Sequence, residues 1–139
     1  MTEPASESPL LPDDPFEALR ALPDLKRRTF RTPAAGKAAR PFSVLSITDD
    51  SLEVRTSTGG RVTLRAEAFQ AAEKAVGDLG AIDPDGWVPI SDPTLTAVLQ
   101  SENRDKACGS YVLPLLEALG RVALERSRPA RVRLPSPSA

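Results

Sequence analysis

The succession of elements expected between residues 66 and 134 constrains the fold of this chain more than any other feature of its sequence. Helical spacing of apolar residues, Asp-Pro and glycine signals, and short alternating runs predict six elements there. They are a helix, a strand, two helices and two strands, at about Ala66–Leu79, Gly86–Ile90, Pro93–Gln100, Ser110–Leu119, Arg121–Arg126 and Ala130–Leu134. This mixture of helices and short strands predicts an α+β domain.

A three-stranded antiparallel meander is expected in front of this unit. Apolar and β-branched residues at Phe42–Ile47 are followed by two alternating runs, which the turn at Gly59-Gly60 separates. A two-residue loop at these glycines would divide the apolar residues between the two faces of the sheet. A three-residue loop would pair Val54 with Leu64 and keep both on one face with Val62. We therefore expect the three-residue loop, with one glycine in the left-handed conformation.

Prolines and glycines adjust the limits of the later elements. Pro89 has no N–H to donate, so the strand that contains it is expected at the edge of its sheet. Pro114 is too deep for a helix that begins at Ala107, so we expect Ser110 to be the N-cap. Gly120 is expected to end the same helix.

An acidic segment with one short apolar stripe begins the chain. Asp14 and the proline after it predict the start of a short amphipathic helix, which carries Phe16, Leu19 and Leu22 on one side. The residues before it are expected to be disordered. The stripe has two interpretations: it docks on its own domain, or it folds into the groove of a partner protein.

The positive charge is concentrated in two tracts, although the net charge is −1. Residues 26–40 carry six basic residues and no acidic one, and residues 121–139 carry five basic residues and one acidic one. A basic arm beside a folded domain often grips phosphates, although a solvated linker has the same composition. The chain is therefore expected to comprise a disordered acidic arm with a short helix, a basic linker, a single globular domain and a disordered tail, at 1–25, 26–40, 41–134 and 135–139.

The composition removes most kinds of catalysis. The chain has no histidine and a single cysteine, Cys108, which excludes histidine-dependent nucleophilic catalysis, zinc clusters and an intrachain disulfide. No glycine-rich phosphate loop is present, and the acidic turn at Asp49-Asp50 is expected to be solvated. We therefore predict a non-enzymatic, cytoplasmic protein without catalytic residues, cofactor, metal, small-molecule substrate or membrane span.

One phrase of the sequence, from Tyr111 to Val122, carries a helix into a strand through a Leu-Gly join. Together with the element order of residues 66–134, it resembles the second helix of the winged helix-turn-helix superfamily where that helix runs into the wing. The resemblance implies that the helix Ser110–Leu119 enters the major groove of DNA and that the wing contacts the backbone or the minor groove. The wing residues would be Arg126, Arg128, Arg131 and Arg133.

The outward positions of that helix favour phosphate contacts over base reading. They are Ser110, Pro114, Glu117 and Ala118, and none is an Arg, Lys, Asn or Gln that could read base edges. The connection from Gln100 to Ser110 is also longer than the roughly three or four residues of a tight helix-turn-helix. The first hypothesis is therefore a winged-helix-like module that binds DNA mainly through phosphates, with low sequence specificity.

The residues expected to contact DNA come from the basic linker, the connection before the second helix, and the last hairpin. They are Lys26, Arg27, Arg28, Arg31, Lys37, Arg40, Arg104, Lys106, Ser110, Arg121, Arg126, Arg128, Arg131 and Arg133. The alternative hypothesis is a protein-interaction or homodimerisation adaptor with the same fold. In that case Phe16, Leu19 and Leu22 would dock on a partner.

Overall fold

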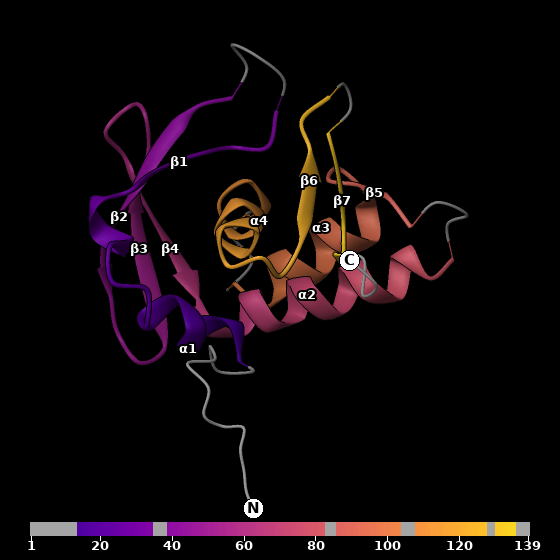
Figure 1. The fold of residues 1–139 in the computed structure, drawn as a ribbon, viewed down its shortest axis with the longest axis horizontal. Helices are drawn as coiled ribbons and strands as arrows, with labels where there is room; N and C mark the ends of the chain where they lie inside the picture. The colour runs from indigo at the N-terminus through magenta and orange to yellow at the C-terminus, as the bar shows by residue number, and fades with distance from the viewer. Residues whose placement is uncertain (1–13, 35–38, 83–85, 104–107, 128–129, 136–139) are drawn as a thin grey trace, which may run out of the picture.

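The computed structural model describes residues 14–34, 39–82, 86–103, 108–127 and 130–135 (Figure 1). The helices are α1 (Pro15–Arg20), the 3-10 helix η2 (Leu25–Arg27), α2 (Ala66–Gly80), α3 (Pro93–Ser101) and α4 (Gly109–Ala118). The strands are β1 (Thr29–Arg31), β2 (Pro41–Ile47), β3 (Ser51–Arg55), β4 (Arg61–Arg65), β5 (Val88–Pro89), β6 (Ala123–Glu125) and β7 (Arg131–Arg133). These elements confirm the α+β class, and no helix among them is long and apolar enough to cross a membrane. Residues 1–13 and 136–139, expected to be disordered, lie outside the described residues.

The strands form two separate antiparallel sheets with α4 between them (Figure 1). The first sheet has the order β1-β2-β3-β4, and the second has the order β5-β7-β6. α4 contacts β1 of the first sheet and β6 of the second, while α2 packs against α1, α3, α4 and β7. The core therefore lies around α4, and the N-terminal strands and the last hairpin cover opposite sides of that helix.

The first sheet has four strands, so the expected three-stranded meander is wrong by one strand. The additional strand is β1, which lies in the segment expected to be a basic linker and pairs with β2. Phe30 is buried, and its ring stacks on that of Phe42 with 5.6 Å between the centroids. One buried aromatic residue thus holds a three-residue strand whose neighbours, Thr29 and Arg31, are exposed. A single apolar residue between polar ones is too short a pattern for a period to be read.

The hairpin between β3 and β4 has the expected loop length, displaced by one residue. The Thr56 amide donates to the Gly60 carbonyl at 2.8 Å and the Gly59 amide to the Thr56 carbonyl at 3.0 Å, which leaves residues 57–59 as the connection. Gly59 has a φ of 90°, so the prediction of a left-handed glycine is confirmed. Val54 pairs with Val62, and not with Leu64 as expected. The shift moves each pairing by two positions along one strand, so the apolar residues stay on one face.

The short N-terminal helix α1 is part of the chain's own core. The Asp14 carboxylate accepts from the Phe16 amide at 3.3 Å and caps the helix, as predicted. Phe16 and Leu19 are both 0% exposed, and the Phe16 ring lies 5.5 Å from that of Phe69 on α2. This is the interpretation in which the stripe docks on its own domain.

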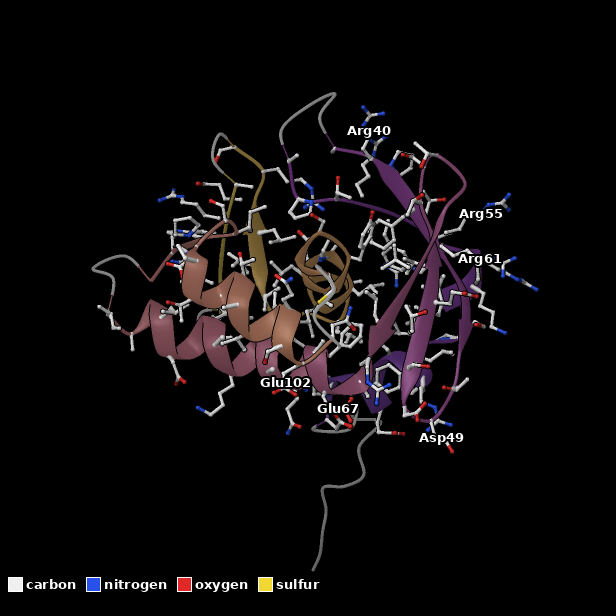
Figure 2. The ribbon with its side chains drawn as sticks, turned by 180° about the vertical axis from the view of Figure 1, so that it is seen from behind. Arg40, Asp49, Arg55, Arg61, Glu67 and Glu102 are labelled. Atoms are coloured by element: carbon white, nitrogen blue, oxygen red, sulfur yellow. The ribbon has the colours of Figure 1, made fainter. Side chains whose placement is uncertain are left out.

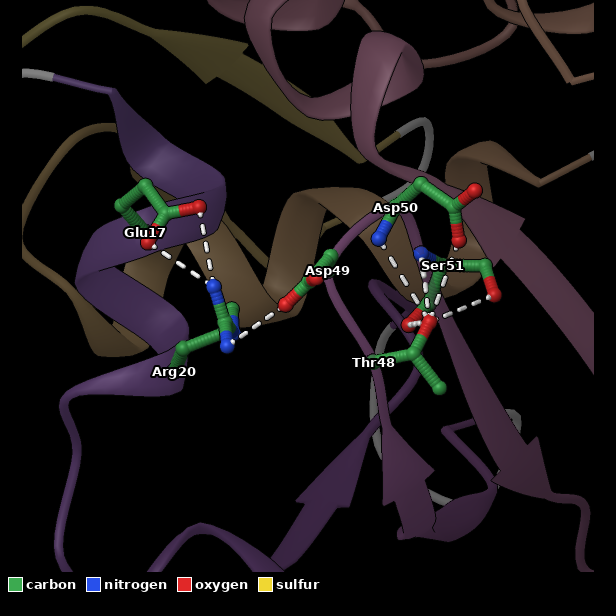
Figure 3. Close-up of polar contacts among 6 residues, drawn as sticks. All are labelled: Glu17, Arg20, Thr48, Asp49, Asp50 and Ser51. Carbon is green, nitrogen blue, oxygen red and sulfur yellow. Dashed lines mark hydrogen bonds and ion pairs between the residues drawn. The ribbon is translucent and has the colours of Figure 1, made fainter.

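The turn before β3 lies beside α1 and forms an exposed ion pair with it (Figure 3). Arg20 of α1 pairs with Asp49 of the turn at 2.9 Å and with Glu17 one turn earlier at 3.1 Å. The Thr48 hydroxyl lies 3.1 Å from an Asp50 carboxylate oxygen and accepts from the Ser51 amide at 3.2 Å. The acidic pair at residues 49 and 50 therefore serves a structural turn.

α4 begins earlier than expected and contains its proline. Its N-cap is Cys108, and no side chain bonds the first turn, so the prediction that Ser110 is the N-cap is wrong. Pro114 lies inside the helix and cannot donate to the Ser110 carbonyl. Since Ser110 is exposed, water can reach that carbonyl, which makes the missing bond less costly than in a buried turn.

The other expected helix and strand limits agree with the structure. Gly120 has a φ of 76°, and its amide donates to the Glu117 carbonyl at 2.9 Å, which ends α4 as predicted. Asp92 caps α3 by accepting from the Thr94 amide at 2.8 Å. β5 pairs with β7 alone and so lies at the edge of its sheet, as Pro89 predicted.

Candidate nucleic-acid interface

The helix expected to enter the major groove is covered on both sides. Its residues Val112, Leu113, Pro114, Leu115 and Leu116 are all buried. Of the outward positions expected from the sequence, Pro114 is buried and Glu117 is bonded to Arg126, so only Ser110 is exposed. The middle of the helix therefore offers no exposed side chain to a DNA groove, and groove entry stays a prediction. The reason is that apolar residues surround the helix, and a helix that is apolar on all sides is buried.

The arginines of the last hairpin that the structure describes, Arg126, Arg131 and Arg133, contact other side chains. Arg126 donates to both carboxylate oxygens of Glu117 at 3.0 Å, and the Arg131 Nε donates to Glu125 at 2.6 Å. Arg131 and Arg133 also lie over the Trp87 ring, with guanidinium-to-centroid distances of 5.4 and 4.6 Å. The carboxylates neutralise Arg126 and Arg131, and the Trp87 ring contacts Arg131 and Arg133. The hairpin therefore offers fewer unpaired positive charges to a ligand than its composition indicates.

Arg121 is a structural tether between α2 and the start of the hairpin. Its guanidinium donates to the two carboxylate oxygens of Glu73 at 3.0 and 2.8 Å. Both side chains are about three-quarters buried, with 23% and 27% of their surfaces exposed. A bidentate pair in this position orders the fold and is not free to bind phosphate.

The basic segment supplies exposed cations. Lys26, Arg27, Arg28, Arg31 and Arg40 are all exposed, and none pairs with a carboxylate of the residues that the structure describes. The Arg28 guanidinium lies 5.3 Å from the centroid of the Phe30 ring, and Arg31 donates to the Ala39 carbonyl at 3.4 Å. These contacts orient the two side chains and leave their charges without a counterion.

The basic segment and the loop end of β6 meet in one groove. The Arg126 Nη2 donates to the Arg31 carbonyl at 3.1 Å, which places β1 beside the end of β6. The groove has a volume of about 290 Å³, and α4 contributes three of its residues. We call it the β1–β6 groove, lined by Arg28, Thr29, Phe30, Arg31, Pro114, Glu117, Ala118 and Arg126. Two segments that lie far apart in the sequence thus share one side of the molecule.

A second hollow brings together Arg40 and Ser110, two more of the residues expected from the sequence. It has a volume of about 540 Å³, and hydroxyl groups of Thr32, Thr56 and Thr58 are among its lining. Arg40 therefore lies beside the loop between β3 and β4. Together we call the exposed cations of this segment the basic surface: Lys26, Arg27, Arg28, Arg31 and Arg40.

Two exposed arginines outside the set expected from the sequence add to the basic surface. Arg55 and Arg61 are cross-strand partners on β3 and β4, and both are exposed. Arg61 lies 3.8 Å from Glu53, and 70% of its side chain is exposed. Figure 2 shows both pointing outward on the same edge as Arg40, away from Asp49, Glu67 and Glu102. The alternation of polar and apolar residues in the two strands could have identified this pair.

Several residues that the sequence placed at a binding site lie either outside the described residues or in the core. Lys37, Arg104, Lys106 and Arg128 lie outside the described residues. Phe16 and Leu19 are fully buried and Leu22 packs against the core, so the prediction that they dock on a partner is wrong.

The single cysteine is buried and protonated at neutral pH. The Cys108 thiol donates to the Leu99 carbonyl at 3.6 Å, and burial raises its pKa to about 11. A thiol with this pKa is a poor nucleophile. Within the described part of the chain, no group of three or more His, Cys, Asp or Glu residues is placed to hold a metal ion.

No protein-family model, curated protein or solved structure matches this chain. The function is therefore inferred from the geometry of the chain's own residues.

Proposed function

We propose that this protein is a non-enzymatic, winged-helix-like module that binds DNA mainly through backbone phosphates. The observation that supports this most strongly is the set of exposed cations at Lys26, Arg27 and Arg40, none of which pairs with a carboxylate of the described residues. Phosphate oxygens are the groups that arginine and lysine contact most often on duplex DNA.

The arrangement of elements supports the winged-helix part of the proposal. α2, β5, α3, α4, β6 and β7 follow one another in the order helix, strand, helix, helix, strand, strand. β5 and the last hairpin form one sheet, which is separate from the N-terminal sheet. The hairpin thus follows α4 and packs beside it, which is the position that a wing would have.

The exposed cations determine how the module would bind. Lys26, Arg27 and Arg40 have no carboxylate partner in the described part of the chain, whereas the hairpin arginines are occupied. The basic segment, with Arg55 and Arg61 beside it, therefore provides most of the binding energy. Since α4 is buried, base edges are not read by that helix, and unrelated DNA sequences bind with similar affinity.

The test is duplex binding followed by fluorescence anisotropy at about 50 mM salt, a concentration at which phosphate contacts are strong. The triple variant Lys26→Ala, Arg27→Ala, Arg40→Ala is expected to bind on the order of tenfold more weakly, equally for unrelated duplexes. Lys74→Ala is the matched control. Lys74 is an exposed cation that pairs with Asp78 on α2, so its removal should change little. No binding by the unaltered protein, or equal weakening in the triple variant and the control, would overturn the proposal.

A further inference from the structure

We propose that the β1–β6 groove binds an extended acidic peptide, which pairs antiparallel with the free edge of β1 as a fifth strand of the first sheet. The segment would alternate acidic and small apolar residues. This binding uses the backbone of β1, which distinguishes it from the proposed attachment to DNA, although Arg28, Arg31 and Arg126 are shared by both.

The hydrogen-bond pattern of β1 shows which of its backbone groups face the groove. Phe30 pairs with Phe42, and the Thr32 amide donates to the Arg40 carbonyl at 2.9 Å. Antiparallel ladders alternate, so residues at every second position bond their partner and the residues between them point away. Thr29 and Arg31 are those intermediate residues, and Arg31 lies opposite Pro41, which has no N–H to donate. The backbone groups of Thr29 and Arg31 therefore point to the free edge.

The contact with Arg126 gives direct support for this orientation. The Arg31 carbonyl accepts from the Arg126 Nη2 at 3.1 Å, so this carbonyl is directed at the groove and can accept an N–H donor. A peptide amide in the same position would replace a single side-chain donor. The Arg126 Nη1 would stay on Glu117, and the released Nη2 could donate to an acidic side chain of the peptide.

The other edge of the same sheet is closed. The Asn103 side chain lies against β4, where its Nδ2 donates to the Thr63 carbonyl at 3.1 Å and its Oδ1 accepts from the Arg65 amide at 2.7 Å. Asn103 is 2% exposed, so this edge cannot take a further strand. The difference between the two edges directs an added strand to β1.

The side chains around β1 define the chemistry of the peptide. Thr29 and Arg31 are exposed on the outer face, and the arginines 28 and 126 line the same groove. Peptide residues opposite Thr29 and Arg31 would lie on this face, where acidic side chains are favoured. Residues between them would lie on the face of Phe30, beside Pro114 and Ala118, where small apolar side chains are favoured. The recognised pattern is thus acidic, apolar, acidic.

The test uses a fluorescent peptide with the sequence Glu-Val-Glu-Val-Glu and two N-methylated versions of it. In the proposed pairing the Glu amides point to β1 and the Val amides point away, because amides alternate along a strand. Methylation of the Glu amides should therefore weaken binding by tenfold or more, whereas methylation of the Val amides should have little effect. Equal affinities of the two methylated peptides would show attraction by charge alone and would overturn the proposal.

A protein variant tests the same contact from the other side. Thr29→Pro removes an N–H that does not bond β2, and a proline is tolerated on the free side of an edge strand. This variant should bind the unmethylated peptide at least tenfold more weakly than Thr29→Ala, and its affinity for duplex DNA should not change. If Thr29→Pro does not fold, the methylated peptides still decide. Weaker DNA binding together with unchanged peptide binding would contradict the inference.

Discussion

At the scale of single residues, the arginines differ by their partners and not by their position in a basic tract. Arg121 and Arg126 each make two bonds to a glutamate that lies far from them or in another element. Lys26, Arg27 and Arg40 come from a segment without acidic residues and have no such partner in the described chain. A cation held by a partly buried carboxylate stabilises the fold, while an exposed cation without one is available to a ligand.

This division predicts that replacing two different cations will change the stability of the protein by different amounts. Arg121→Ala should lower the free energy of unfolding by about 1–3 kcal/mol, because it leaves the partly buried Glu73 carboxylate without its charged donor. Lys74→Ala, which breaks an exposed pair with Asp78, should have little effect. Urea unfolding monitored by circular dichroism measures both. Equal free energies for the two variants would show that the Arg121 pair is not a structural tether.

The buried thiol predicts a pH dependence of stability. Its pKa is raised from 9.0 to about 11 in the folded protein, so the folded state holds this proton more tightly than the unfolded state. The resulting stabilisation is constant below about pH 9 and disappears as the pH rises from 9 toward 11. Unfolding free energies of the protein and of Cys108→Ala, measured from pH 7 to pH 11, should therefore converge or cross only above pH 9. Parallel profiles over the whole range would contradict a buried, protonated thiol.

At the scale of elements, local patterns identified most helices and strands but not their partners. Helical spacing and Asp-Pro caps found α2 and α3, and the alternation around Val54 and Val62 found the correct face of the hairpin. β1 was missed because Phe30 is the only apolar residue in it. The hairpin loop is displaced by one residue, and α4 starts earlier than expected. Glycine and proline therefore indicate the region in which an element ends, but not the exact residue.

The burial of α4 is the element-scale finding with the largest effect on function. Its residues 112 to 116 are all apolar and span more than one helical turn of about 3.6 residues, so apolar side chains point to every side, which is a sign of burial that the sequence contains. What the sequence does not contain is the identity of the covering elements, because β1 and β6 reach α4 through long-range contacts. The partners of the hairpin arginines, such as Trp87 for Arg133, are long-range in the same way.

The packing of α1 gives a prediction at this scale. Phe16→Ala should lower the free energy of unfolding by roughly 3–5 kcal/mol, since it empties a fully buried site against Phe69. Leu22→Ala should cost less, because Leu22 is only partly buried. Thermal and urea unfolding of both variants measures the difference. A stable Phe16→Ala protein would mean that α1 is not part of the core and would return it to the role of a partner-binding segment.

At the scale of the whole molecule, three exposed arginines lie apart from three exposed carboxylates. Figure 2 shows Arg40, Arg55 and Arg61 on one edge, and Asp49, Glu67 and Glu102 on another part of the surface. The basic tracts are distant in the sequence, and the contact between Arg126 and β1 brings them together. The composition was enough to identify the two basic tracts. Their contact could not be predicted from it, because that contact depends on the packing of two sheets around α4.

The salt dependence of duplex binding tests most directly whether this basic surface holds phosphates. A plot of the logarithm of the binding constant against the logarithm of salt concentration should be a line with a slope of about −0.9 for each phosphate bound. Replacing Lys26, Arg27 and Arg40 by alanine should make the slope shallower by about one for each phosphate that is no longer bound. A slope near zero, or one that these substitutions leave unchanged, would contradict phosphate binding by the basic surface.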